Sequence, residues 1–155
     1  MARREKRGIR LIGWREWVGL PDLSIEAVKA KVDTGASTSS LHAVDIQPFD
    51  QDGLPHVRFL VHPIQRRQRP EIACIAQVHD YRPVTSSSGH REERYVIRTK
   101  ARVGTLSWPI EITLTDRDAM GFRMLLGRQA LRRRFLVDSG HSFVGGAQRI
   151  ALDKI

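Results

Sequence analysis

The pattern of hydrophobic and polar positions predicts a mostly β protein. Short runs rich in β-branched and aromatic residues recur along the chain, and Gly, Pro, Asp or Ser separates them, which is typical of strands joined by turns. In the clearest run, Ile110, Ile112 and Leu114 alternate with polar residues, which indicates a strand with one face on the core and one in water. We expect strands at residues 14–18, 24–32, 57–61, 72–78, 94–103 and 108–114.

One stretch, residues 128–134, has a helical pattern, because Leu131 falls on one face and arginines on the other. We therefore expect one short helix near the C-terminal end. Residues 47–54 and 85–91 are rich in Pro, Asp, Gly or Ser, which is typical of loops. The second loop joins two apolar-rich segments and is a candidate flap, although its spacing alone favours an ordinary hairpin tip.

Composition indicates a single domain. The chain has 155 residues, 41% of them hydrophobic, enough for one core but too few for two large lobes. Residues 1–8 are expected to form a flexible basic N-terminus. No apolar run of about 18 residues is present to span a membrane, and the charged start lacks the apolar segment of a signal peptide, so we expect a cytoplasmic protein. The single cysteine, Cys74, has apolar neighbours, which favours a buried structural thiol.

The formal net charge of +9 raises the question of a nucleic-acid partner. The basic residues do not support one, because they cluster separately at 3–7, 66–69 and 132–134, without interleaved aromatic residues for base stacking. A positive field of this kind also attracts acidic polypeptides. We therefore expect a peptide or protein partner rather than a nucleic acid, and the positive charge favours an acidic one.

Several chemistries lack their motifs. The six histidines include no His-Glu-x-x-His spacing for zinc. The glycines at 140–146 are not followed by the Gly-Lys-Ser/Thr of a phosphate-binding loop, and no Gly-x-Ser-x-Gly elbow is present. We expect neither a metal nor another cofactor.

The candidate chemistry is that of a carboxylate. Asp33-Thr34-Gly35 follows an apolar run, and residues 124–128 form a second apolar run that ends in Gly127-Arg128. Asp-Thr-Gly alone is common in ordinary turns. In an acid protease, however, two aspartates share one proton, so that one activates water while the other protonates the scissile carbonyl. A single Asp33 therefore supplies only one of the two carboxylates that such a site needs.

The second carboxylate has two possible sources. Leu136-Val137-Asp138-Ser139-Gly140 repeats the apolar-Asp-Ser/Thr-Gly pattern, but only 15 residues follow Gly140 in the chain of 155, too few to build a second lobe. A turn after the helix is the expected role of Asp138. The other source is an identical chain, because a two-fold axis beside Asp33 brings two copies of the loop together. The chemistry thus predicts a homodimer.

Two signatures resemble those of retropepsins, single-lobed aspartic proteases that work as homodimers: Val32-Asp33-Thr34-Gly35-Ala36 and Leu125-Leu126-Gly127-Arg128. Nearly the whole chain is similar to a bacterial retropepsin-like family that is associated with RimK-type glutamate ligases and often labelled ATP-dependent zinc protease. The stretches that carry this similarity are residues 12–18, 29–36, 41–43, 87–90, 114–117 and 124–128. Because the sequence offers neither a zinc motif nor a nucleotide site, we expect an aspartic peptidase that needs neither.

The resemblance implies an acid protease fold, a closed β-barrel with one short C-terminal helix, in which Asp33 is catalytic and Thr34 and Gly35 shape its loop. It implies that Leu126, Gly127 and Arg128 support this loop. The residues that it suggests as substrate contacts are Ala36, Ser37, Ser87, Ser88, Gly89 and His90.

Two departures from the retroviral pattern stand out. Ser37 takes the place of the acidic residue that pairs with the arginine after the second Gly, which leaves Arg128 without its expected partner. Gly35 and Gly127 are 92 positions apart, more than in compact retroviral enzymes. We therefore expect the flap and the dimer contacts to be rebuilt.

Two functions from different classes follow. The first is a homodimeric aspartic endopeptidase that acts on peptides, with acidic or glutamate-rich peptides favoured by the positive charge. The second is a non-catalytic β-barrel module that keeps the Asp33 loop as scaffold and binds an acidic protein or RNA.

Overall fold

The computed structural model describes residues 8–86, 88–117, 121–146 and 149–150. Residues 1–7, which make up most of the expected flexible N-terminus, and the candidate substrate contact Ser87 lie outside the described residues. The described part is mostly β with one short α-helix, as predicted.

The elements follow one another along the chain as mostly short strands. They are β1 (Ile9–Gly13), β2 (Arg15–Leu20), a 3-10 turn at Pro21–Leu23, β3 (Ile25–Asp33), β4 (Ser39–His42), β5 (Val44–Gln51), β6 (Leu54–Val61), β7 (Ile72–Gln77), β8 (Asp80–Thr85), β9 (Arg91–Val103), β10 (Leu106–Thr115), β11 (Met124–Gly127), α1 (Arg128–Leu131), β12 (Phe135–Asp138) and β13 (Arg149–Ile150). The six predicted strands are all present, with shifted ends.

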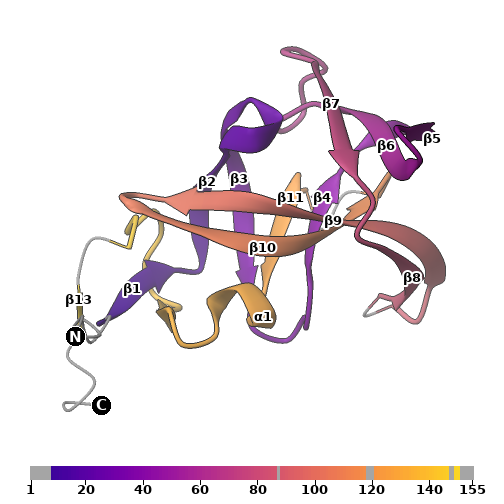
Figure 1. Cartoon of the computed structure of the whole chain (residues 1–155). Helices are drawn as coiled ribbons and strands as arrows, with labels where there is room; N and C mark the ends of the chain where they lie inside the picture. Colours follow the sequence, from indigo (N-terminus) through magenta and orange to yellow (C-terminus); the bar gives the residue numbers. More distant parts are fainter. Residues whose placement is uncertain (1–7, 87, 118–120, 147–148, 151–155) are drawn as a thin grey trace, which may run out of the picture.

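The main sheet contains seven strands in the order β10-β4-β11-β3-β2-β9-β8, and β9 also pairs with β10. This extra pairing closes six of the strands into a ring of hydrogen-bonded neighbours. Fully buried residues of the ring, among them Val28, Ile97, Ile112 and Leu126, form much of the core. Helix α1 lies beside the ends of β3 and β11 (Figure 1).

Two smaller sheets flank the ring. Strands β5, β6 and β7 form one of them, and β12, β1 and β13 form the other. The first sheet lies between β4 and β8 along the chain, so it supplies much of the long separation between Gly35 and Gly127. In Figure 1 it stands at the opposite side of the ring from β1.

The prediction of a loop at residues 47–54 was wrong. Most of this stretch belongs to the β5–β6 hairpin, in which Pro48 pairs with Val57 and the turn lies at Asp52 and Gly53. Both turn residues have positive φ, +54° and +76°. Proline is tolerated because β5 is an edge strand, where a missing N–H need not break a ladder. The Pro, Asp and Gly residues that predicted a loop mark an edge strand and the turn that follows it.

The helix is shorter than predicted. It ends at Leu131 instead of Arg134, because Arg132 has an extended ψ of 130° and Arg133 takes a positive φ of 66°. Three arginines therefore follow the helix as a turn that leads into β12.

The polar face predicted for residues 110–115 is also partly wrong. Ile110, Ile112 and Leu114 are buried as expected, but Thr113 and Thr115 are buried as well, at 1% and 6% exposure. Their hydroxyl groups are satisfied inside the protein, by the Ser39 carbonyl oxygen and by Glu92. Threonine at these positions is thus part of a polar network rather than a solvent-facing surface.

Cys74 is buried, as predicted, and burial raises the pKa of its thiol to about 11. A thiol with this pKa is almost entirely protonated near neutral pH and is a poor nucleophile. No helix in the described part of the chain is long and apolar enough to cross a membrane.

Candidate active site

Asp33 is the last residue of β3, and its half-buried carboxylate sits over a tight turn. The Gly35 N–H donates a hydrogen bond to Asp33 Oδ1 at 2.9 Å, and the Ala36 N–H approaches the Asp33 carbonyl oxygen at 3.3 Å. The turn therefore fixes one carboxylate oxygen with a backbone donor and leaves the other outside this bond. Thr34, Gly35 and Ser37 are exposed around it.

The second signature lies directly beside the first. Strand β11 runs parallel to β3, with Leu126 opposite Val32 and Gly127 opposite Asp33. A Cβ on Gly127 would lie 2.5 Å from both the carbonyl carbon and the oxygen of Thr38, so only glycine allows this approach. The predicted juxtaposition of the two segments is confirmed.

Arg128 holds the Asp33 loop through backbone oxygens. Its side chain donates from Nη1 to the Thr34 carbonyl oxygen at 3.0 Å, and its N–H donates to the Ala36 carbonyl oxygen at 2.7 Å. The next residue, Gln129, donates its N–H to the Ser37 carbonyl oxygen at 3.1 Å. The carbonyl group of Thr34 thus takes the place of the acidic partner that Ser37 does not supply.

Ser39 was not identified from the sequence, yet it is part of this support. Its side chain is buried, and Oγ accepts the Gly127 N–H at 3.0 Å. The Ser39 carbonyl oxygen in turn accepts a hydrogen bond from Thr113 Oγ1 at 3.3 Å. Ser39 thus joins β4 and β10 to β11, whose Gly127 is paired with Asp33 of β3.

The other candidate substrate contacts lie at the tip of the β8–β9 hairpin. The tip closes with hydrogen bonds from the Ser86 N–H to the His90 carbonyl oxygen and from the Gly89 N–H to the Ser86 carbonyl oxygen, at 2.8 and 2.9 Å. Gly89 has a positive φ of 83°, and Ser88 Oγ bonds to Ser86 Oγ. The prediction of a hairpin tip is therefore confirmed, while the contact of Ser88, Gly89 and His90 with substrate stays a prediction.

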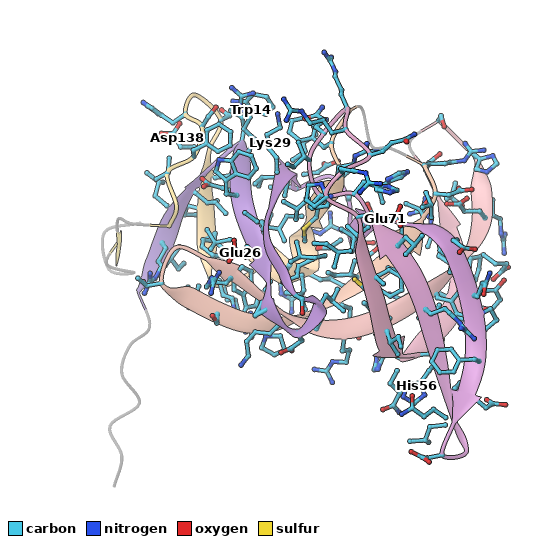
Figure 2. The ribbon with its side chains drawn as sticks, turned by 90° about the horizontal axis from the view of Figure 1, so that it is seen from above. Trp14, Glu26, Lys29, His56, Glu71 and Asp138 are labelled. Carbon is cyan, nitrogen blue, oxygen red and sulfur yellow. The ribbon has the colours of Figure 1, made fainter. Side chains whose placement is uncertain are left out.

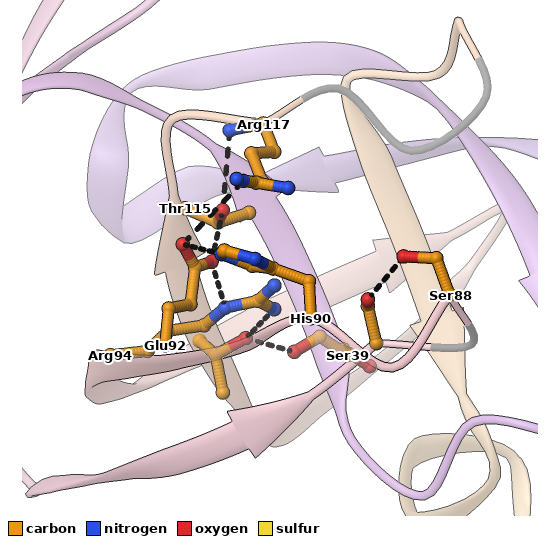
Figure 3. Close-up of polar contacts among 9 residues, drawn as sticks. Ser39, Ser88, His90, Glu92, Arg94, Thr115 and Arg117 are labelled. Carbon is orange, nitrogen blue, oxygen red and sulfur yellow. Dashed lines mark hydrogen bonds and ion pairs between the residues drawn. The ribbon is translucent and has the colours of Figure 1, made fainter.

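A polar network lies just below this tip and was also missed from the sequence (Figure 3). Glu92 accepts hydrogen bonds from Thr115 Oγ1, at 2.7 Å, and from Arg94 Nε. Arg117 Nε and His90 Nε2 lie 3.8 and 4.0 Å from the other carboxylate oxygen. Burial alone raises the pKa of Glu92, but the bonds from Thr115 and Arg94 and the charges of Arg94 and Arg117 lower it overall.

Asp138 repeats the local geometry of Asp33. It ends β12, the Gly140 N–H donates to its Oδ1 at 2.9 Å, and it is paired with Gly13 of the parallel strand β1. The Gly140 N–H and a bond from His141 Nδ1, at 2.6 Å, lower the pKa of Asp138. The expected turn after the helix is present, as a second loop of the same build.

Aromatic and cationic side chains that are separate in sequence form one surface series near Asp138. Trp17 stacks on Phe143, Arg15 lies over both Phe143 and Trp14, and Trp14 meets Phe122 edge to face. Lys29 lies over Phe122. Trp17 is 52% exposed and Phe143 41%. Trp14, Lys29 and Asp138 are on the same side of the molecule, away from His56 (Figure 2). We call these residues the aromatic–cation series.

No three His, Cys, Asp or Glu side chains of the described residues come together as metal ligands.

Comparison with known proteins gives a consistent picture. A family model described as RimB-like, retropepsin-like aspartic endopeptidase RimB, matches residues 11–148. A probable alpha-L-glutamate ligase of Shewanella halifaxensis is 48% identical over 138 residues, which is 89% of this chain and 30% of that protein. A second, from Desulfotalea psychrophila, is 50% identical over 129 residues, 83% of this chain and 28% of that protein. This chain thus spans less than a third of these relatives.

A solved structure shares the fold. The crystal structure of a protein of unknown function from Legionella pneumophila superposes with a TM-score of 0.72 and 26% sequence identity. The match covers 88% of this chain and 98% of that one.

Proposed function

Because this chain belongs to the family of RimB-like, retropepsin-like aspartic endopeptidases, we propose that it hydrolyses peptide bonds with a carboxylate dyad formed by Asp33 of two identical subunits. In this proposal the ring of strands is the closed barrel of the acid protease fold, and the family relationship extends to the reaction.

The observation that carries the proposal is the pairing of Asp33 with Gly127. A half-buried carboxylate sits on a turn with one oxygen held by the Gly35 N–H, and the loop is fastened by Arg128 and Ser39. Such a loop keeps the carboxylate in one orientation, and no cationic side chain of the described residues forms an ion pair with it. Preorganisation of this kind is what catalysis by two like charges needs.

The mechanism follows from the protonation of such a pair. Two adjacent carboxylates cannot both ionise cheaply, so one proton is shared between them. The ionised Asp33 takes a proton from a water molecule, whose oxygen attacks the scissile carbonyl carbon. The protonated Asp33 donates its proton to the carbonyl oxygen. The resulting diol collapses as one of its hydroxyl groups gives its proton to the ionised aspartate, the C–N bond breaks, and the leaving nitrogen takes the proton of the other aspartate, so that the dyad again holds one proton.

Acidic peptides are the substrates to try first. The net charge of +9 favours approach of an acidic polypeptide. Relatives that contain a matching region are named alpha-L-glutamate ligases, which suggests glutamate-rich peptides in particular. The hairpin tip at Ser88–His90 and the loop residues Ala36 and Ser37 are the proposed contacts.

The first test compares two aspartates in similar loops. Asp33→Asn should lower kcat by roughly 10²–10⁴-fold, the usual contribution of a general acid or base. Asp138→Asn is the matched control, because Asp138 accepts the same backbone hydrogen bond in the same kind of turn. Full activity of pure Asp33→Asn protein against peptides would contradict the aspartic mechanism.

A subunit-mixing experiment tests the dyad itself. If each site needs Asp33 from both subunits, a mixed dimer with one Asp33→Asn chain is inactive. Equal amounts of wild-type and variant chains, mixed after unfolding, should therefore retain about one quarter of the wild-type activity per total dimer. Retention of one half would mean that each subunit works alone.

A non-catalytic binding module is the second candidate, and the aromatic–cation series favours it. Stacking faces next to arginine and lysine can bind the bases and phosphates of RNA or an acidic protein. Affinity for single-stranded RNA that falls steeply with salt, is unchanged in Asp33→Asn and is lost in Trp17→Ala would support this module. Without peptide cleavage, that result would replace the peptidase proposal.

A further inference from the structure

We propose that Glu92 is a positioning residue that sets the β8–β9 hairpin against the ring and couples it to the Asp33 loop. The inference rests on the proposed function, because it assigns to the hairpin a role at the Asp33 site. Its evidence lies in the point where the backbone pairing of β9 changes.

Backbone pairing holds only part of β9 to β10. The register of the two strands runs from Leu106–Val103 to Thr113–Val96 and ends there. Beyond Val96, towards the hairpin tip, β9 remains paired with β8, as in the pairs of Arg94 with Arg82 and Glu92 with Val84. The hairpin therefore projects from the ring at Val96.

Side-chain contacts connect β9 to β10 beyond the point where their backbone pairing ends. Arg94 Nη1 donates to Thr113 Oγ1 at 3.3 Å, and Glu92 accepts from Thr115 Oγ1 and faces Arg117. These contacts join the projecting part of β9 to the last residues of β10. Glu92 also accepts from Arg94, so it orients the guanidinium that reaches Thr113. The angle of the hairpin thus depends on one carboxylate and its partners.

The same contacts continue to the site. Thr113 Oγ1 accepts from Arg94 and donates to the Ser39 carbonyl oxygen, and Ser39 Oγ accepts the Gly127 N–H. Gly127 is the residue paired with Asp33. A series of hydrogen bonds, joined within Ser39 by its own covalent structure, therefore links Glu92, through β9, β10, β4 and β11, to the neighbour of the candidate catalytic residue. Figure 3 shows the part between Glu92 and Ser39.

Hydrogen exchange tests this coupling without any need for peptidase activity. Glu92→Gln keeps the shape of the side chain but removes the charge that holds Arg94 and Arg117. We expect exchange to become roughly tenfold faster in peptides that cover residues 82–95 and in the peptide that contains Gly127. Glu93→Gln is the matched control, because Glu93 is the adjacent residue, is exposed and points to the other face of the strand.

A second variant breaks the middle of the path. Thr113→Val removes the hydroxyl group that joins Arg94 to Ser39 and preserves the volume. If the path carries the coupling, Glu92→Gln should no longer change the exchange of Gly127 in a Thr113→Val background, while its effect on the hairpin remains. Thr99→Val is the control for the change from threonine to valine, since in the described part of the chain the buried Thr99 hydroxyl has no hydrogen-bond partner. Equal exchange in Glu92→Gln and Glu93→Gln, or additive effects at Gly127, would overturn the proposal.

Steady-state kinetics can distinguish a displaced hairpin from partial unfolding, because the two change KM and kcat differently. A hairpin released from the ring should bind peptide less well, so Glu92→Gln should raise KM roughly tenfold with kcat changed less than about twofold. A protein that is merely less folded would instead lose kcat in proportion to its inactive fraction. Full activity in Asp33→Asn would remove the proposed reaction but leave the exchange results, and the positioning role that they test, intact.

Discussion

Arg128 donates a hydrogen bond to the carbonyl oxygen of Thr34 at 3.0 Å, so the guanidinium holds the backbone of the Asp33 loop rather than a carboxylate. The bond is solvent-exposed, which limits its contribution to stability. Its position next to Asp33 gives it more effect on the order of the loop than on the free energy of unfolding.

Arg128→Met should therefore lower the free energy of unfolding by only about 0.5–1 kcal/mol and increase hydrogen exchange at Gly35 and Ala36. Urea unfolding and exchange by mass spectrometry measure the two effects. Arg132→Met is the control, because Arg132 lies just past the helix and is exposed. A loss of stability well above about 1 kcal/mol, without faster exchange at Gly35 and Ala36, would contradict this view of Arg128.

Glu16 is a buried carboxylate that fastens distant backbone segments. It is 1% exposed and accepts the N–H groups of Gly13, Val144 and Gly145 at 2.7 to 2.8 Å. Glu16→Gln turns one acceptor into a donor that faces backbone donors. We expect a loss of about 2–3 kcal/mol, measured by denaturant unfolding, while Glu26→Gln on the exposed face of β3 should change stability by less than about 0.5 kcal/mol.

Thr99 offers a stabilising substitution. Its hydroxyl oxygen is buried and has no hydrogen-bond partner among the described residues, so the folded state carries the cost of its lost hydration. Thr99→Val should raise the free energy of unfolding by about 1 kcal/mol, seen as a higher thermal midpoint. Thr113→Val, which removes a hydroxyl with two partners, should lower it. The same sign for both variants would be inconsistent with this difference.

Glu92 predicts a pH dependence of stability. Because its pKa is lowered in the folded protein, its contribution is fully present above the unfolded value of about 4.3 and is lost as the pH falls through the folded pKa. Glu92→Gln removes this contribution. The variant should be less stable than wild type at pH 7, and the difference should shrink below about pH 4. A constant difference between pH 7 and pH 3 would refute it.

The neighbours of Asp33 could be predicted from the sequence because a few residues determine them. The Asp33 turn needs a glycine two positions on, and the parallel partner needs a glycine that lets Thr38 approach. Both requirements can be recognised in the sequence as a glycine at a fixed position. Likewise, the apolar surroundings of Cys74 correctly indicated a buried thiol.

Other features depend on contacts that no local pattern contains. In β2, Glu16 is buried while the adjacent Trp17 is 52% exposed, the reverse of what hydrophobicity suggests. Glu16 is buried because residues 144 and 145, far along the chain, bring donors to it, and Trp17 is exposed because it stacks on Phe143. Ser39, Glu92 and Thr113 were missed for the same reason, since each bonds across strands that are distant in sequence.

Closure of the ring by β9 and β10 limits the strand edges at which this protein can pair with other chains. In the described part, free strand edges lie at β8, β5, β7, β12 and β13, of which β12 and β13 are only four and two residues long. Pro83 interrupts the edge of β8 and Pro48 that of β5. Strand β7 has no proline, and its Ile75 is 59% exposed. Addition of a foreign strand, as in aggregation, therefore meets least obstruction at β7, where a single lysine in place of Ile75 would provide the missing protection.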